Sequence, residues 1–260
     1  MFFLEQKIME TAFYCYLSMI TSILCLGLFF CSSKLSHFIS STYLQLSFKD
    51  KINWNTRITS NIHAVVVTSL ALYAFFYDEA TLADSFWYTN SIIVRIGISI
   101  TFGFIFTDLL IILWYYDCFQ EINFIIHHLM VLLAYYFVVG KGYLLFFANI
   151  RQIAELSTPF VNQRWFYHIT GQPRHSRLFV QNGIIMVFAF FLGRIVFIPY
   201  FYFKTLSVWS DPKRIALGPV VSFLWIFTTI VLDVLNIFWF FKMIQGCVKL
   251  FFPYFSTKSK

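Results

Sequence analysis

Charged residues are scarce in this sequence, and their scarcity excludes an ordinary soluble globular protein. Asp, Glu, Lys and Arg make up 12% of the 260 residues, whereas soluble domains contain about 25%. Hydrophobic residues account for 59% and lie in continuous runs of about 20 residues, long enough for a helix to cross a bilayer. Continuous rather than alternating runs favour membrane helices over barrel strands. The composition therefore predicts an all-α polytopic membrane protein.

Cysteine and histidine are also few, and several catalytic signatures are missing. The five Cys residues form no C-x-x-C pair and no framework spacing, so we interpret them as packing residues. The six His residues are scattered and too few for the two metal shells of a di-iron oxygenase. A P-loop, a dinucleotide fingerprint and a nucleophile elbow are absent. We therefore expect no metal and no cofactor.

Seven apolar runs are candidate transmembrane helices. They cover residues 11–31, 58–77, 93–116, 122–139, 143–160, 179–202 and 216–243. The fifth is the least apolar, because it contains the polar run "ANIRQIAE", and such a helix needs a protein interior to face. The predicted organisation is an N-terminal helix with its connection (1–43), a membrane domain (44–250) and a short basic tail (251–260).

Basic residues predict the orientation, because Lys and Arg near helix ends stay on the cytosolic side. With the N-terminus lumenal and the C-terminus cytosolic, eleven basic residues fall on the cytosolic side and five on the lumenal side. The acidic loop "DEATLAD" (78–84) is then lumenal. The net charge of +7 is expected to lie at the membrane surface, and no segment resembles a nucleic-acid-binding domain. Membrane lipids are the expected partners, and the oligomeric state stays open.

Ionisable residues inside the spans mark the candidate site, since each costs about 2.5–3.5 kcal/mol at mid-membrane unless protein groups satisfy it. The candidates are His63, Asp108, His127, His128, Arg151, Glu155, Arg194 and Asp233. None lies on the first span, which we therefore expect to be peripheral to the other six. His127 and His128 point about 100° apart on a helix but can border one cavity, so they are candidate catalytic residues. The alternative is structural: one His bonds a carboxylate such as Asp108 and the other a backbone carbonyl.

Polar side chains of the fifth span recur every three residues and predict one polar helix face that ends at Pro159. The expected polar lining of a lipid pocket comprises Asp108, Asn149, Arg151, Gln152 and Glu155. The alternative is an i, i+4 pair of Arg151 with Glu155 that neutralises itself and holds helices together.

Three polar residues of the last two spans are assigned a structural role. Arg194 is the expected counter-charge for Asp233 or Asp108. Asn236 lies close to one helical turn from Asp233.

Several segments together resemble the TLC (TRAM, Lag1 and CLN8 homology) domain family. They are "SFKDKINWNTR", "DEATLAD", the membrane "IHH", "AELSTPFVNQRWF" and "LDVLNIFW". The resemblance covers residues 44–250 and implies a six-helix membrane barrel around a lipid-sized cavity, often in the endoplasmic reticulum, with an additional helix outside.

Ceramide synthases of this family join an acyl chain from acyl-CoA to a sphingoid amine, and their histidine pair corresponds to His127 and His128. They carry a further His-Asp pair on the next helix, where this sequence reads "FFANIRQIAE" without a His. The main hypothesis is therefore an endoplasmic-reticulum protein that binds or handles lipid and contributes to lipid homeostasis. The alternative is an acyltransferase with acyl-CoA as co-substrate and both histidines catalytic, Glu155 replacing part of the missing cluster. A cargo receptor or translocation accessory is a third reading.

Overall fold

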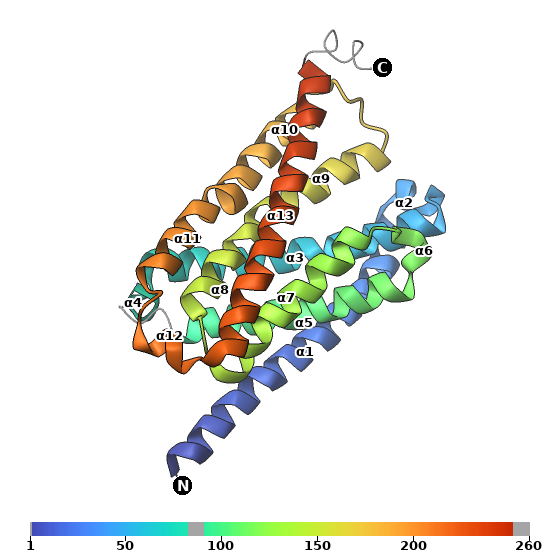
Figure 1. The fold of residues 1–260 in the computed structure, drawn as a ribbon. Coiled ribbons are helices and arrows are strands. Elements are labelled where there is room, and N and C mark those ends of the chain that lie inside the picture. The colour runs from blue at the N-terminus through green and yellow to red at the C-terminus, as the bar shows by residue number, and fades with distance from the viewer. Residues whose placement is uncertain (1, 83–90, 252–260) are drawn as a thin grey trace.

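The computed structural model describes residues 2–82 and 91–251. Within these ranges the chain forms helices and no strand (Figure 1). They are α1 (Phe2–Ile39), α2 (Ser41–Gln45), α3 (Phe48–Tyr77), α4 (Glu79–Leu82), α5 (Ile92–Trp114), α6 (Tyr116–Phe119), α7 (Ile122–Lys141), α8 (Leu145–Gln152), η1 (Ile153–Ser157), α9 (Thr158–Ile169), α10 (Arg177–Phe190), η2 (Phe191–Ile195), α11 (Phe197–Ser207), α12 (Pro212–Ala216) and α13 (Gly218–Phe251). The predicted acidic loop lies partly outside the described residues, and the predicted tail lies outside them from residue 252 onward.

Six helices of the described ranges are long and apolar enough to cross a membrane. They are α1, α3, α5, α7, the combined run α10–η2–α11, and α13. Each contains or largely overlaps one of the predicted spans, so the prediction of an all-α polytopic membrane protein is confirmed.

The fifth predicted span is a broken helical segment rather than one long helix. It consists of α8, the 3-10 turn η1 and α9. Pro159 lies in the first turn of α9 and has no N–H to donate to the preceding turn, so the α-helical ladder is interrupted there. The helical course continues to Ile169 instead of ending at Pro159, and this segment is not among the six candidate spans.

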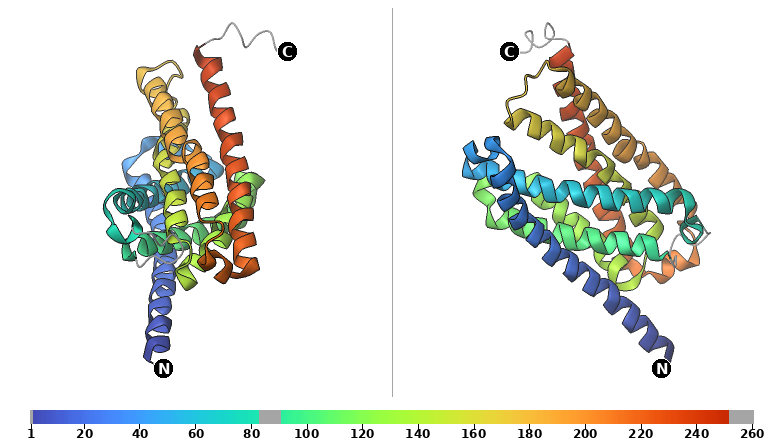
Figure 2. Two further views of the ribbon diagram at one scale, coloured as in Figure 1. Left: turned by 60° about the vertical axis from the view of Figure 1, so that its left-hand side comes forward. Right: turned by 180° about the vertical axis from the view of Figure 1, so that it is seen from behind.

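The first helix lies on the outside of the bundle, against α3, α5 and α7, and its N-terminal half extends beyond the other helices (Figure 2). Polar contacts attach it to α5. Ser22 Oγ donates to the carbonyl of Gly103 at 2.8 Å, and Arg95 forms an ion pair with Glu10. A Cβ on Gly103 would lie 2.2 Å from the carbonyl oxygen of Ser18, so the close approach of the two helices requires glycine.

Candidate functional site

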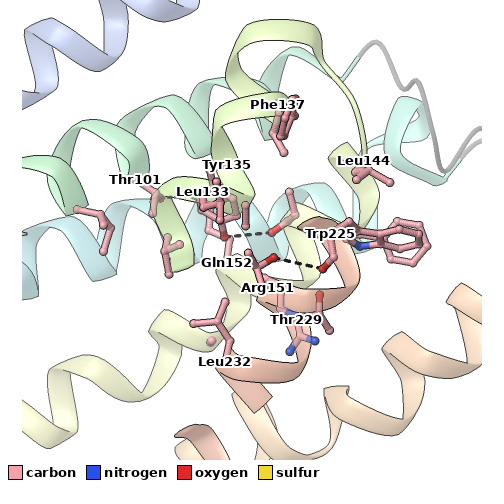
Figure 3. Close-up of a pocket in the computed structure, with 18 of the residues that line it drawn as sticks. Thr101, Leu133, Tyr135, Phe137, Leu144, Arg151, Gln152, Trp225, Thr229 and Leu232 are labelled. Atoms are coloured by element: carbon pink, nitrogen blue, oxygen red, sulfur yellow. Dashed lines mark hydrogen bonds between the residues drawn. The ribbon is translucent and has the colours of Figure 1, made fainter. Parts of the chain in front are cut away.

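A narrow pocket lies between α7 on one side and α8, η1 and α13 on the other (Figure 3). Its walls are mainly apolar side chains of α7 and α13, with Phe147 and Ala148 of α8 and Phe201 of α11. None of its lining residues belongs to α1 or α3. The open volume is about 70 Å³, less than the roughly 300–1,000 Å³ of typical ligand pockets. The lipid-sized cavity that the resemblance implies is therefore not open to that volume here.

The pocket is long relative to its volume. On α7 the lining runs from His127 to Val138, which spans about 16 Å at 1.5 Å per helical residue. On α13 it runs from Val221 to Asn236, about 22 Å. One leaflet of a bilayer has a hydrocarbon depth of about 15 Å, half of the total of about 30 Å. The lining residues therefore extend over about the depth of one leaflet around a small open volume, and we call this pocket the slot.

An ion pair between Arg151 and Asp233 joins α8 to α13. The guanidinium donates from Nη1 to Oδ1 at 2.5 Å and from Nη2 to Oδ2 at 3.0 Å, which is bidentate geometry. The same guanidinium lies over the ring of Phe201, 4.2 Å from its centroid. The prediction that Arg194 is the counter-charge of Asp233 or Asp108 is wrong, because Arg151 binds both carboxylate oxygens of Asp233 and Asp108 is bonded to His128. Glu155 accepts a hydrogen bond from Thr158 Oγ1 at 2.7 Å instead of closing an i, i+4 pair.

Arg194 lies on η2, a single π-helical turn that interrupts the α10–α11 run. Its Nε donates to the carbonyl of Ala154 at 3.1 Å and to Ser157 Oγ at 3.2 Å, and its Nη1 donates to Asn236 Oδ1 at 3.0 Å. These bonds satisfy the carbonyl and hydroxyl of η1 where the α-helical ladder is broken. Arg194 therefore ties three segments together at the polar end of the pocket, with Asn236 as partner instead of a carboxylate.

Two amides of α8 face different neighbours. Gln152 lines the pocket and donates from Nε2 to Thr101 Oγ1 at 2.7 Å. Its buried Oε1 has no hydrogen-bond partner among the described residues. Asn149 donates to the carbonyl of Ala71 on α3 at 3.1 Å and is not among the lining residues. The single polar face predicted for this segment is thus divided between the pocket and α3.

His128 is held by hydrogen bonds at both ring nitrogens. Nδ1 lies 2.6 Å from the carbonyl oxygen of Phe124, and Nε2 lies 2.9 Å from Asp108 Oδ2. One histidine thus makes both contacts that the structural alternative divided between two. Asp108 does not line the pocket.

His127 has different surroundings, although it is the next residue. It lines the pocket, and its ring stands edge-on to Trp239 with centroids 5.4 Å apart. Its buried Nδ1 has no hydrogen-bond partner within the described part of the chain. The histidine pair therefore combines one ring bonded at both nitrogens with one ring whose buried Nδ1 has no described partner.

The structure brings His127, Arg151, Gln152, Glu155, Arg194 and Asn236 to the pocket. Sequence reasoning missed the α13 wall, which includes Trp225, Thr228 and Thr229. Two adjacent threonines in the run "WIFTTIVLD" are the signal that could have pointed to it. Within the described ranges, the pocket included, no group of three or more His, Cys, Asp or Glu side chains could hold a metal ion.

Comparison with known proteins decides the family. Residues 53–245, more than half of the chain, match the family model of the TLC domain. The chain belongs to the TLC domain family. Every residue that lines the pocket lies inside the TLC domain, whereas α1 precedes it.

The relatives with this TLC domain cover most of the chain. TLC domain-containing protein 4 of Homo sapiens is 40% identical over 85% of this chain and 84% of its own. TLC domain-containing protein 4-B of Xenopus laevis is 38% identical over the same shares. TLC domain-containing protein 4 A of Dictyostelium discoideum is 28% identical over 79% and 78%. No solved structure matches the chain significantly.

Proposed function

We propose that this TLC-domain protein binds the acyl chain of a membrane lipid between α7 and α13 and contributes to lipid homeostasis in the endoplasmic reticulum. The observation that carries the proposal is the slot itself. It has apolar walls along about one leaflet's depth of helix, and polar groups of Glu155, Arg194 and His127 meet at one end. Such a slot suits a molecule with an apolar tail and a polar end.

The small open volume makes binding dependent on movement. An acyl chain needs more than the 70 Å³ that is open, so side chains along the slot must move apart. The backbone of α13 packs closely against α7, α10, α12 and η2 but not against α8, so we expect the slot to widen between α13 and α8. The Arg151–Asp233 ion pair links α8 to α13, and we propose that it keeps the two helices in register while the slot widens.

Filling the slot tests the proposal. Ala134→Phe adds a ring to the α7 wall, whereas Leu129→Phe adds volume at an exposed position of the same helix that does not line the slot. Both proteins are purified in detergent, and the lipids that copurify are extracted and quantified by mass spectrometry. We expect Ala134→Phe to lower the copurified lipid at least fivefold and Leu129→Phe to leave it unchanged. Equal lipid content in the two folded variants would refute the proposal.

A second function, acyl transfer from acyl-CoA, is favoured by one observation. His127 presents a buried ring nitrogen without a described partner at the polar end of the slot. It would take the proton of an attacking amine or hydroxyl while the thiolate of coenzyme A leaves. His128, which is bonded to Asp108 of α5, would hold α7 in position and take no part in the proton transfer. Purified protein is incubated with labelled acyl-CoA, sphingoid bases and lysolipids, and a labelled product made by the wild type but not by His127→Ala would establish this function.

A further inference from the structure

A second cleft, separate from the slot, lies at the end of the molecule where α9 ends, α10 begins and α13 approaches the C-terminus. Its volume is about 620 Å³, within the range of ligand-binding pockets. Arginines line it at three positions, Arg57 of α3, Arg164 of α9 and Arg174 of the α9–α10 connection, and histidines at two, His168 and His175. No Asp or Glu is among the described residues that line it.

Two of these arginines are fixed on aromatic rings. The guanidinium of Arg57 lies 4.8 Å from the ring centroid of Trp165, and that of Arg164 lies 4.8 Å from the ring centroid of Phe179. Arg57 also donates from Nη1 to Asn162 Oδ1 at 2.8 Å. A guanidinium held in this way keeps its fork of N–H donors in one orientation. The other basic side chains, on the connection and the end of α9, are exposed around this pair.

The positive charge of the cleft is not neutralised by the described chain. None of the three arginines takes part in an ion pair among the described residues. The buried Nε of Arg57 has no hydrogen-bond partner there. Asp108 is the carboxylate that acts electrostatically on Arg57, and it is already bonded to His128. The guanidinium groups of the cleft therefore favour an anionic ligand.

The aromatic residues beside the cleft are typical of a position at the membrane surface. Trp54, Trp165 and Phe166 form a cluster beside it, with ring centroids 6.4 Å and 4.8 Å from Trp54. Tryptophan is enriched where membrane meets water. Gly246 of α13 also lines the cleft, and no atom lies within 4 Å of the place of a Cβ there, so α13 leaves room for a bulky group.

We propose that this cleft binds a phosphate group, carried either by an anionic phospholipid or by a water-soluble phosphate compound. Arg57 and Arg164 bind the phosphate oxygens through their guanidinium forks, and Arg174, His168 and His175 draw the anion in from the rim. This proposal is independent of lipid binding in the slot, because the two sites share no lining residue.

The test uses full-length protein in detergent and isothermal titration calorimetry. The probes are inorganic pyrophosphate, dioctanoyl phosphatidic acid and, as the zwitterionic control, dioctanoyl phosphatidylcholine. We expect dioctanoyl phosphatidic acid to bind more tightly than dioctanoyl phosphatidylcholine. Binding of pyrophosphate as well identifies a soluble phosphate compound as a sufficient source, and binding of phosphatidic acid alone identifies the phospholipid. Absence of binding by all three probes to folded protein overturns the proposal.

Two pairs of substitutions test whether phosphate binding depends on the residues of the cleft or on positive charge in general. Arg164→Gln with Arg174→Gln removes two charges from the cleft, and Arg177→Gln with Lys242→Gln removes two exposed charges at the same end that do not line it. We expect the first pair to weaken binding roughly 10- to 100-fold, as loss of charge-assisted hydrogen bonds does, and the second less than threefold. Equal weakening by both pairs overturns the proposal.

A third pair of substitutions distinguishes weaker binding from a folding defect, which the first pair could cause because Arg164 also packs on Phe179. Arg174→Gln with His175→Gln changes exposed residues only, and its melting temperature is compared with that of the wild type. We expect weakened phosphate binding at an unchanged melting temperature. Unchanged binding by this pair, together with a lowered melting temperature of the Arg164 variant, would assign the basic residues to stability and overturn the proposal.

Discussion

Removing one member of the Arg151–Asp233 pair should destabilise the protein strongly, whereas removing both should not. The pair is bidentate, and its side chains are only 15% and 6% exposed. Asp233→Leu leaves the guanidinium of Arg151 between α8 and α13, where the ring of Phe201 is its remaining described contact. Breaking a buried pair in this way costs about 3–5 kcal/mol, because the remaining charge is uncompensated. The reverse change, Arg151→Met, leaves a buried carboxylate and should cost a similar amount.

The double variant shows whether the loss of stability comes from losing the ion pair or from leaving one charge buried without a partner. Two apolar side chains of similar volume replace a buried ion pair at little cost, so Arg151→Met with Asp233→Leu should be more stable than either single variant. Stability is measured by equilibrium unfolding in mixed micelles with increasing dodecyl sulfate, followed by tryptophan fluorescence. Val234→Leu, at an exposed position of the same helix, is the control and should lie within about 0.5 kcal/mol of the wild type. A double variant less stable than both singles would refute the reasoning.

Three further predictions follow from the packing, the histidine pair and the orientation. Gly103→Val should destabilise the protein by about 1–3 kcal/mol because its Cβ meets the carbonyl of Ser18, and Gly27→Ala, which meets nothing within 4 Å, should not; a common unfolding midpoint would contradict this. Asp108→Leu leaves the Nε2–H of His128 unpaired and should lower the unfolding free energy by about 1–3 kcal/mol in the same assay, whereas Asp108→Asn, which keeps an acceptor, should lower it less. With the broken segment α8–η1–α9 as a seventh crossing beside the six long helices, the termini lie on opposite sides of the membrane, so a glycosylation acceptor added before residue 1 should be modified in cells and one added after Lys260 should not; modification of both, of neither, or of the second alone would contradict this topology.

Most of the fold could be predicted from hydropathy, because six spans are long apolar runs that contain few charges. The break in the fifth segment could be predicted in part from Pro159, but the 3-10 turn before it depends on Arg194 bonding the carbonyl of Ala154. Neither effect changes the apolar period along the chain. The 3-10 turn η1 is a consequence of contacts that only the folded bundle provides.

The sequence predicted most of the polar residues that line the slot, but not which side chains bond to one another. Arg151, Gln152, Glu155 and His127 were recognised as intramembrane polar groups, and they do line the slot. Which arginine meets Asp233 depends on the rotation of each helix about its own axis, and hydropathy does not record this rotation. The three-residue period of Asn149, Gln152 and Glu155 likewise predicted one face, although the segment changes from α-helix to 3-10 helix between the last two.

Photo-crosslinking tests the central claim, that an acyl chain occupies the slot between α7 and α13. A phospholipid with a diazirine in its acyl chain is mixed with the protein in nanodiscs and irradiated, and the labelled residues are mapped by mass spectrometry. The account predicts labels on slot residues such as Val131, Leu224 and Thr228, and their loss in Ala134→Phe but not in Leu129→Phe. Labels confined to outward-facing side chains such as Phe223 and Val234, unchanged by Ala134→Phe, would contradict it.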